Sequence, residues 1–382
     1  MLSFLVLTCH AQNSPGEIPV FKRVTNAFMP SITSEYFFFS NDGLIWFSTA
    51  KGLASFDGSE LLYHCNLKQS TLYGLTKVGA MLEDQQHNFY LTTPLGLFYY
   101  NRRNETFSKL QYPVKNSTEK SAFLFTSLFK DTQGQIFIGS IFNGLFIYDP
   151  EKKHFEHINL DNSTTDTKGD RMLNTIFCFA SDPSNPAQLW VGTFHGIYIF
   201  NKRTKKFSQH FEIVTGPENI YSSIFIASKQ NIDVQRMDVE NDSTIWFNSW
   251  TTGFANYNTR TGKAQIVFGW KNKLQTDGAF DAYIIPKFVK QSTGKYLLGI
   301  FNGKTAFFDT KTNTASFFNV SEKEYEHEQT RYTDKDRDGN IWILQRGILY
   351  VSLPPTLRLQ HIETIGNKSQ QPELSGIYFD SA

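Results

Sequence analysis

The segment Asp42-Gly-Leu-Ile-Trp-Phe-Ser-Thr49, with Gly52-Leu53 and Phe56-Asp57 behind it, decides how this chain folds. It runs from a polar turn through three apolar residues and two hydroxyl residues to a glycine, and then into a second apolar run. Short runs of β-branched and aromatic residues between turn residues are typical of β-strands. A glycine between two such runs permits the positive φ that a tight hairpin needs. The segment therefore predicts two antiparallel strands.

The same pattern is written seven times along the chain. The central residues of the apolar triplets are Trp46, Tyr90, Phe137, Trp190, Trp246, Leu297 and Trp342. Successive copies are about 49 residues apart on average, a period that matches one four-stranded propeller blade rather than a helical solenoid unit. The prediction is an all-β protein, a seven-bladed β-propeller of four-stranded antiparallel blades.

The four strands of each copy can be placed from the pattern. The innermost strand precedes the Asp turn, at Tyr36–Ser40, Val78–Leu82 and Ser127–Lys130 in the first three copies. The triplet forms the second strand, the run after the glycine forms the third, and a polar hairpin rich in Lys and Arg leads to the fourth. Phe21–Val24 is an outer strand with no blade before it, so we expect it to pair with Ile348–Ser352 and close the ring.

The pattern also predicts domain limits. Residues 1–11 are read as a signal peptide, possibly truncated, because a short apolar run ends in small residues but lacks a positively charged start; a lipidated Cys9 is the alternative. Residues 20–356 are the propeller. Residues 357–382 contain Ser375–Ser381, which is similar to the first strand and Asp turn of an eighth copy, so they are expected to begin a following propeller; an irregular tail is the alternative.

Composition excludes several classes of function. The chain has 37 Lys and Arg against 36 Asp and Glu, a net charge of +1, so no excess charge supports broad binding to nucleic acid or to anionic membranes. Its three cysteines cannot form a disulfide scaffold or a four-ligand zinc site; Cys65 and Cys178 fall in the first and fourth copies and are expected to be free thiols. No cofactor is expected.

The copies resemble the two-component regulator propeller repeat, most clearly at Asp42–Gly58, Asp131–Asp149 and Asp336–Val351. The resemblance covers about residues 20–381. It implies the periplasmic sensor region of a bacterial hybrid histidine kinase, here the first propeller, which detects a glycan or oligosaccharide and signals to a kinase in a missing C-terminal region. It further implies a homodimer through the full sensor region, no nucleic acid contact by this region, and membrane contact only through a downstream helix. The triplets of the second and sixth copies lack Trp, as does that of the third, and the seventh has Leu344-Gln345 where Gly-Thr is usual.

Aromatic residues in the turns between second and third strands suggest a ligand site. These turns gather at one mouth of a propeller, where aromatic faces can stack on sugars while amide and imidazole groups supply directional hydrogen bonds. Packing between blades is the alternative reading of the same residues. The candidates are Phe142, Asn143, Phe194, His195, Trp250, Phe301 and Asn302.

Three other readings of the sequence remain open. The propeller could be a scaffold that binds proteins through its rims. It could be a glycosidase or lyase, although Arg236, Arg331 and Arg346 share no register and no paired carboxylates with credible spacing are found, so no catalytic residue is assigned. Asp334 to Gly339 has part of the spacing of a calcium loop, but it is also the ordinary Asp turn of its copy, and no metal site is assigned.

Overall fold

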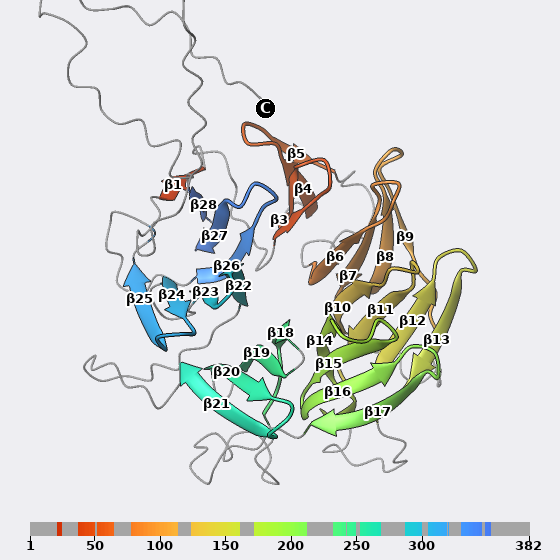
Figure 1. Ribbon diagram of the computed structural model, residues 1–382. Helices are drawn as coiled ribbons and strands as arrows, with labels where there is room; N and C mark the ends of the chain where they lie inside the picture. Colours follow the sequence, from red (N-terminus) through yellow and green to blue (C-terminus); the bar gives the residue numbers. More distant parts are fainter. Residues whose placement is uncertain are drawn as a thin grey trace, which may run out of the picture.

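Seven four-stranded antiparallel sheets follow one another around a common axis in the computed structural model (Figure 1). The structure describes residues 21–24, 37–49, 52–64, 78–113, 124–160, 172–211, 232–241, 243–249, 253–268, 287–299, 305–318, 320, 330–345 and 348–352. The predicted seven-bladed propeller is confirmed. We number the blades 1 to 7 in the order in which their inner strands occur along the chain.

Each blade is a meander whose strands run from the axis outward. In blades 1 and 2 the strands are β2 (Phe37–Phe39), β3 (Ile45–Thr49), β4 (Gly52–Phe56), β5 (Leu61–Tyr63), then β6 (Ala80–Glu83), β7 (Phe89–Thr93), β8 (Gly96–Asn101) and β9 (Thr106–Lys109). In blades 3 and 4 they are β10 (Phe125–Lys130), β11 (Ile136–Ser140), β12 (Leu145–Asp149), β13 (His154–Ile158), then β14 (Ile176–Ser181), β15 (Gln188–Thr193), β16 (Gly196–Asn201) and β17 (Lys206–Phe211).

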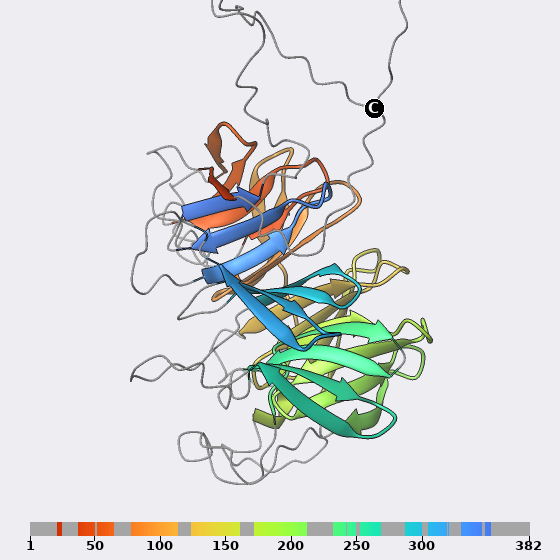
Figure 2. The same ribbon diagram turned by 60° about the vertical axis from the view of Figure 1, so that its left-hand side comes forward.

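Blades 5 to 7 repeat the arrangement, and Figure 2 brings the last two forward. The strands of blades 5 and 6 are β18 (Arg236–Asn241), β19 (Thr244–Ser249), β20 (Gly253–Asn258), β21 (Lys263–Phe268), then β22 (Lys287–Ser292), β23 (Lys295–Gly299), β24 (Thr305–Asp309) and β25 (Thr314–Phe318). Blade 7 contains β26 (Thr330–Lys335), β27 (Ile341–Gln345), β28 (Ile348–Ser352) and β1 (Phe21–Arg23). A short 3-10 turn, η2 (Met172–Asn174), precedes blade 4. No helix among the described residues has the length and apolar character needed to cross a bilayer.

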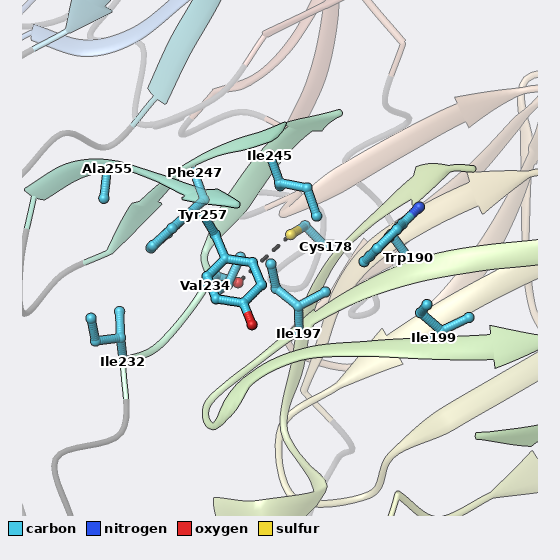
Figure 3. Close-up of a cluster of buried hydrophobic side chains, with 10 residues drawn as sticks. All are labelled: Cys178, Trp190, Ile197, Ile199, Ile232, Val234, Ile245, Phe247, Ala255 and Tyr257. Carbon is cyan, nitrogen blue, oxygen red and sulfur yellow. Dashed lines mark hydrogen bonds between the residues drawn. The ribbon is translucent and has the colours of Figure 1, made fainter. Parts of the chain in front are cut away.

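The second strands are buried on both faces because each lies between two neighbouring blades. Every residue of β3, β7 and β11 is buried, which explains why the triplets read as continuous apolar runs. Each hydrophobic cluster joins adjacent blades. The cluster between blades 4 and 5 contains Cys178 and Trp190 on one side and Ile245 and Phe247 on the other (Figure 3). The core of this protein is therefore a ring of interfaces between blades.

The ring closes through the N-terminal strand, as predicted. β1 pairs with β28 in antiparallel register, with Phe21 opposite Ser352 and Arg23 opposite Tyr350. The ring of Phe21 also stacks on Phe318 of blade 6 at 5.5 Å. A strand from the first part of the chain thus covers the outer edge of the last sheet, which would otherwise expose unpaired backbone groups.

Some predicted boundaries shift. The inner strand of blade 2 begins at Ala80 rather than Val78, and that of blade 3 begins at Phe125 rather than Ser127, with a bulge between Phe125 and Ser127. Tyr36 and Cys65 lie outside the described residues, as do residues 1–11 and 357–382, so the signal peptide and the following propeller stay predictions. Cys178 is a free, buried thiol; burial raises the pKa of this thiol to about 12, so it carries no reactive thiolate at neutral pH.

Three of the triplet tryptophans are fixed by the turn before them. The indole Nε1 donates to Ser40 Oγ at 3.1 Å from Trp46, to Glu240 Oε2 at 2.8 Å from Trp246, and to Asp336 Oδ2 at 2.7 Å from Trp342. The indole nitrogen of Trp190 has no partner among the described residues. In blade 4 the acidic residue of the turn, Asp182, instead accepts hydrogen bonds from Ser184 and Asn185 within its own loop.

This difference gives a test of the turn contacts. Trp246 and Trp190 are buried to a similar degree, 4% and 6% exposed, so replacing either with Phe loses similar apolar area. Trp246→Phe also leaves Glu240 without the indole N–H donor. It should therefore lower the free energy of unfolding by about 1 to 2 kcal/mol more than Trp190→Phe does. Urea denaturation of the two variants measures this; equal losses would show that the turn bond adds nothing.

Candidate functional site: the entry face of the propeller

One end of every blade carries both the turn between the second and third strands and the start of the inner strand. The register shows this directly, since the first residue of an inner strand pairs with the end of the second strand: Ile176 with Thr193, Arg236 with Asn248, and Lys287 with Gly299. We call this end of the ring the entry face. The described members of the predicted site, Phe142, Asn143, Phe194 and His195, all belong to its turns, so the fold places these four candidates on one face.

The turns themselves have a common geometry. A hydroxyl at the end of the second strand donates to the backbone carbonyl of the glycine that opens the third, from Thr49, Thr93, Ser140 and Thr193 at distances of 2.8 to 3.0 Å. Gly96 and Gly196 in these turns have positive φ. The hydroxyl and the glycine fix the turn backbone, which leaves the side chains at its tip available for other roles.

A single buried threonine joins the turns of blades 3 and 4. The backbone N–H of Phe142 donates to Thr175 Oγ1 at 3.2 Å, and the backbone N–H of Phe194 donates to the Thr175 carbonyl at 3.1 Å. Thr175 lies between η2 and β14 and is 1% exposed. Phe142 and Phe194 therefore belong to one connected part of the entry face. We call this part, with His195 beside Phe194, the aromatic ledge.

Phe142 combines a left-handed backbone with an exposed side chain. Its φ is +71°, a left-handed conformation that costs a residue with a side chain about 1 to 2 kcal/mol, and its side chain is 44% exposed. The neighbouring Leu124, whose carbonyl accepts the Ile141 N–H at 2.8 Å, is 47% exposed. An exposed ring recovers little of the backbone cost through packing. This pair forms an apolar surface facing solvent.

The remaining predicted residues of these turns make different contacts. The half-buried rings of Phe194 and His195 meet edge-on at 5.3 Å. Asn143 is committed to its own turn, because its Nδ2 donates to the Ile141 carbonyl at 3.1 Å and its carbonyl accepts from His157 Nε2 at 2.6 Å. Trp250, Phe301 and Asn302 lie outside the described residues, so their place in the site stays a prediction. The structure therefore brings together Phe142, Phe194 and His195.

A second cluster lies where the inner strands of blades 5 to 7 begin. Lys287 Nζ sits 3.9 Å from the centroid of the Tyr332 ring and donates to Tyr332 Oη and, at 2.5 Å, to Asp334 Oδ2. Arg236 places its guanidinium carbon 5.8 Å from the same ring. Arg236 forms no ion pair with any residue in the described part of the chain. Two cations from different blades thus converge on one tyrosine.

The electrostatics of this cluster favour a further negative charge. Burial lowers the pKa of Lys287 to about 8; the nearby Arg236 adds to the effect and Asp334 opposes it. Further along the same two inner strands the charges are balanced. There Asp238 accepts hydrogen bonds from Lys290 at 2.9 Å and from the Tyr296 hydroxyl at 2.7 Å. Within the described residues, the positive charge of Arg236 has no carboxylate to offset it.

Sequence reasoning missed this cluster. In the sequence, Arg236 shares no register with the other arginines, and Lys287 belongs to no motif. A signal was present in the register: Arg236 and Lys287 pair with Asn248 and Gly299. The inner-strand residues at the same place in blades 2, 3 and 4 are small, Ala80, Ser127 and Cys178. A long cation at a position that otherwise holds a small side chain indicates a local function.

The calcium-like spacing at Asp334–Gly339 resolves into separate contacts. Asp334 pairs with Lys287, whereas Asp336 accepts from the Asn340 backbone N–H at 2.8 Å and from the Trp342 indole. The described residues contain no group of three or more His, Cys, Asp or Glu arranged to hold a metal ion. Asp336 therefore serves the turn of blade 7, whereas Asp334 belongs to the cluster around Lys287.

The fold matches solved structures, although no family model matches the chain and no curated protein matches its sequence. The extracellular domain of BT4673 from B. thetaiotaomicron, assigned to a hybrid two-component system, has a TM-score of 0.64 at 17% identity over 88% of this chain. That of BT3049 from B. thetaiotaomicron, assigned likewise, has a TM-score of 0.63 at 19% identity over 89%. The chain spans 40% and 42% of those two structures.

A shorter propeller also matches. Streptogramin B lyase has a TM-score of 0.57 at 12% identity, over 87% of this chain and 96% of that one. At these identities the comparisons show the fold, which is that of the extracellular propeller domains of hybrid two-component systems, and the fold alone.

The buried lysine predicts a pH dependence of stability. Between pH 8 and its ordinary value of 10.5, Lys287 keeps its proton in the unfolded chain and loses it in the folded one, so the free energy of unfolding rises with pH. Relative to Lys287→Met, the wild-type protein should gain about 1.5 kcal/mol between pH 8 and 9.5. Urea denaturation at several pH values measures the difference; a constant or falling difference would contradict the burial of a charged amine here.

Proposed function

We propose that this chain is the ligand-binding propeller of an extracytoplasmic sensor and that its ligand is an oligosaccharide bound at the entry face. The observation that carries the proposal is the ledge of Phe142 and Phe194, held together by Thr175. Phe142 pairs a left-handed backbone with an exposed ring. Such local strain is typical of positions retained for function rather than for stability.

The chemistry of the ledge suits a sugar. The C–H faces of a pyranose ring stack on exposed aromatic side chains, while a few directional polar groups fix its orientation. His195 supplies an imidazole beside Phe194, able to donate or accept according to its tautomer. The exposed Leu124 extends the apolar floor next to Phe142. An exposed, largely apolar surface with few polar groups favours stacking on a saccharide ring.

The comparisons support the setting of this function. BT4673 and BT3049 are represented by extracellular domains, and this chain shares their fold over most of its length. By extension we place the chain in the periplasm, exported by a signal peptide in residues 1–11, with the membrane segment and kinase in a part of the protein outside this sequence. Signal transmission would then pass through a homodimer of the full sensor region.

Substitutions on the ledge test the proposal. Phe142→Gly relieves the left-handed strain and should leave the protein at least as stable as wild type, within about 1 kcal/mol. It should nevertheless weaken saccharide binding about ten-fold by removing a stacking surface. Phe194→Ala should weaken binding similarly. Isothermal titration calorimetry against a panel of oligosaccharides measures the affinities, and urea denaturation the stabilities.

Leu62→Ala provides the matched control. Leu62 is 53% exposed on β5, at the outer rim of blade 1 and away from the entry face, so its loss should leave affinity unchanged. If folded Phe142→Gly and Phe194→Ala proteins bind as tightly as the control, the ledge is not the binding surface. Release of reducing ends or unsaturated products from the panel would instead identify an enzyme.

A further inference from the structure

The Arg236–Lys287 cluster lies on the same face as the aromatic ledge. The segment before β18 is bonded to the turn that carries Phe194, since the Gly196 N–H donates to the Ile232 carbonyl at 2.9 Å and the Val234 N–H to the Thr193 carbonyl at 2.8 Å. Arg236 follows two residues after Val234 as the first residue of its inner strand. The cations and the aromatic rings therefore lie on the same face of the ring, on elements that these hydrogen bonds join.

Lys287 and Arg236 have N–H donors that the contacts within this cluster do not use. An ammonium group has three N–H donors, and Lys287 uses two of them, on Tyr332 and Asp334. The guanidinium of Arg236 offers a planar fork that matches a carboxylate or a sulfate, and no described carboxylate occupies it. A ligand oxyanion between the two groups would complete both sets of hydrogen bonds.

Charge balance points the same way. Asp334 is the only carboxylate that the described contacts place on these two cations, and it pairs with Lys287. Burial next to Arg236 disfavours the charged form of Lys287, so a bound anion would stabilise that form. Two partly buried cations facing one carboxylate leave a single positive charge, which one monoanionic group neutralises.

We propose that the oligosaccharide recognised at the entry face is acidic, and that Arg236 and Lys287 bind its carboxylate or sulfate group beside Tyr332. This inference rests on the proposed function for the identity of the ligand as a sugar. The two parts of the face then have different roles. The ledge of blades 3 and 4 stacks on the sugar rings, and the cations on the inner strands of blades 5 and 6 bind the acidic group. The shared chemistry is an oxyanion on a saccharide, carried either by a uronic acid or by a sulfate ester.

The test is calorimetric titration of the whole chain with three oligosaccharide pools. Oligogalacturonates carry carboxylates alone, carrageenan oligosaccharides carry sulfates alone, and xylo-oligosaccharides are neutral. One acidic pool should bind and the neutral pool should not, and binding should weaken as salt is raised because the ion contacts are screened. The arm that binds identifies the source of the anion.

Variants locate the charge contact. Arg236→Gln should lower affinity for the acidic pool about ten-fold or more, because a charge-assisted hydrogen bond is lost. Lys263→Gln, which removes an exposed cation from the outer strand β21 of the same blade, should leave it unchanged. Because Lys287→Gln alone would strand Asp334, that position is tested as the double variant Lys287→Gln/Asp334→Asn, with circular dichroism to confirm folding; it too should weaken binding.

The outcomes separate this inference from the function on which it rests. A neutral pool that binds with dependence on Phe194 but not on Arg236 overturns the acidic ligand and leaves the ledge intact. Acidic binding that depends on Arg236 but not on Phe142 or Phe194 supports the charge site and overturns the ledge. Equal affinity of Arg236→Gln and Lys263→Gln for the acidic pool overturns the inference, and binding of no pool by the folded wild-type chain overturns both proposals.

Discussion

Packing of each second strand between two neighbouring blades is the interaction on which the rest of this structure depends. Residues such as Phe47, Phe137 and Phe247 are at most 1% exposed, and each cluster that contains them draws on two blades. A blade alone would leave one face of its triplet in water, so the sheets are stable only as a closed ring. The pairing of β1 with β28 is therefore part of the core rather than an addition to it.

The same packing leaves two kinds of position free to vary, the turn tips and the inner-strand positions that carry Arg236 and Lys287. The backbone of a turn is already fixed by its hydroxyl and glycine, so the side chain of Phe142 is free to vary. Arg236 and Lys287 pair with Asn248 and Gly299, where blades 2 to 4 carry the small residues Ala80, Ser127 and Cys178. Both kinds of position meet at the entry face, which makes that face the natural place for function to diverge.

The sequence predicted what depends on periodic burial and missed what depends on contacts across the ring. Seven triplets sufficed for the blade number, and the isolated strand at Phe21 sufficed for the closure. The turns that carry Phe142 and Phe194 were also correctly placed on one face. The meeting of Arg236, Lys287 and Tyr332 was not foreseen, because it joins three blades and no local pattern records which inner strands face one another. The commitment of the Asn143 amide to its own turn was likewise invisible, since it depends on turn geometry rather than on residue type.

Hydrogen–deuterium exchange with and without the acidic oligosaccharide pool tests whether one face of the ring carries the ligand site. We expect slower exchange in segments 140–144, 192–196 and 232–236, with no change in the turns at 40–44 and 336–340 on the opposite face. Protection confined to those opposite turns, or to the outer strands, would contradict it.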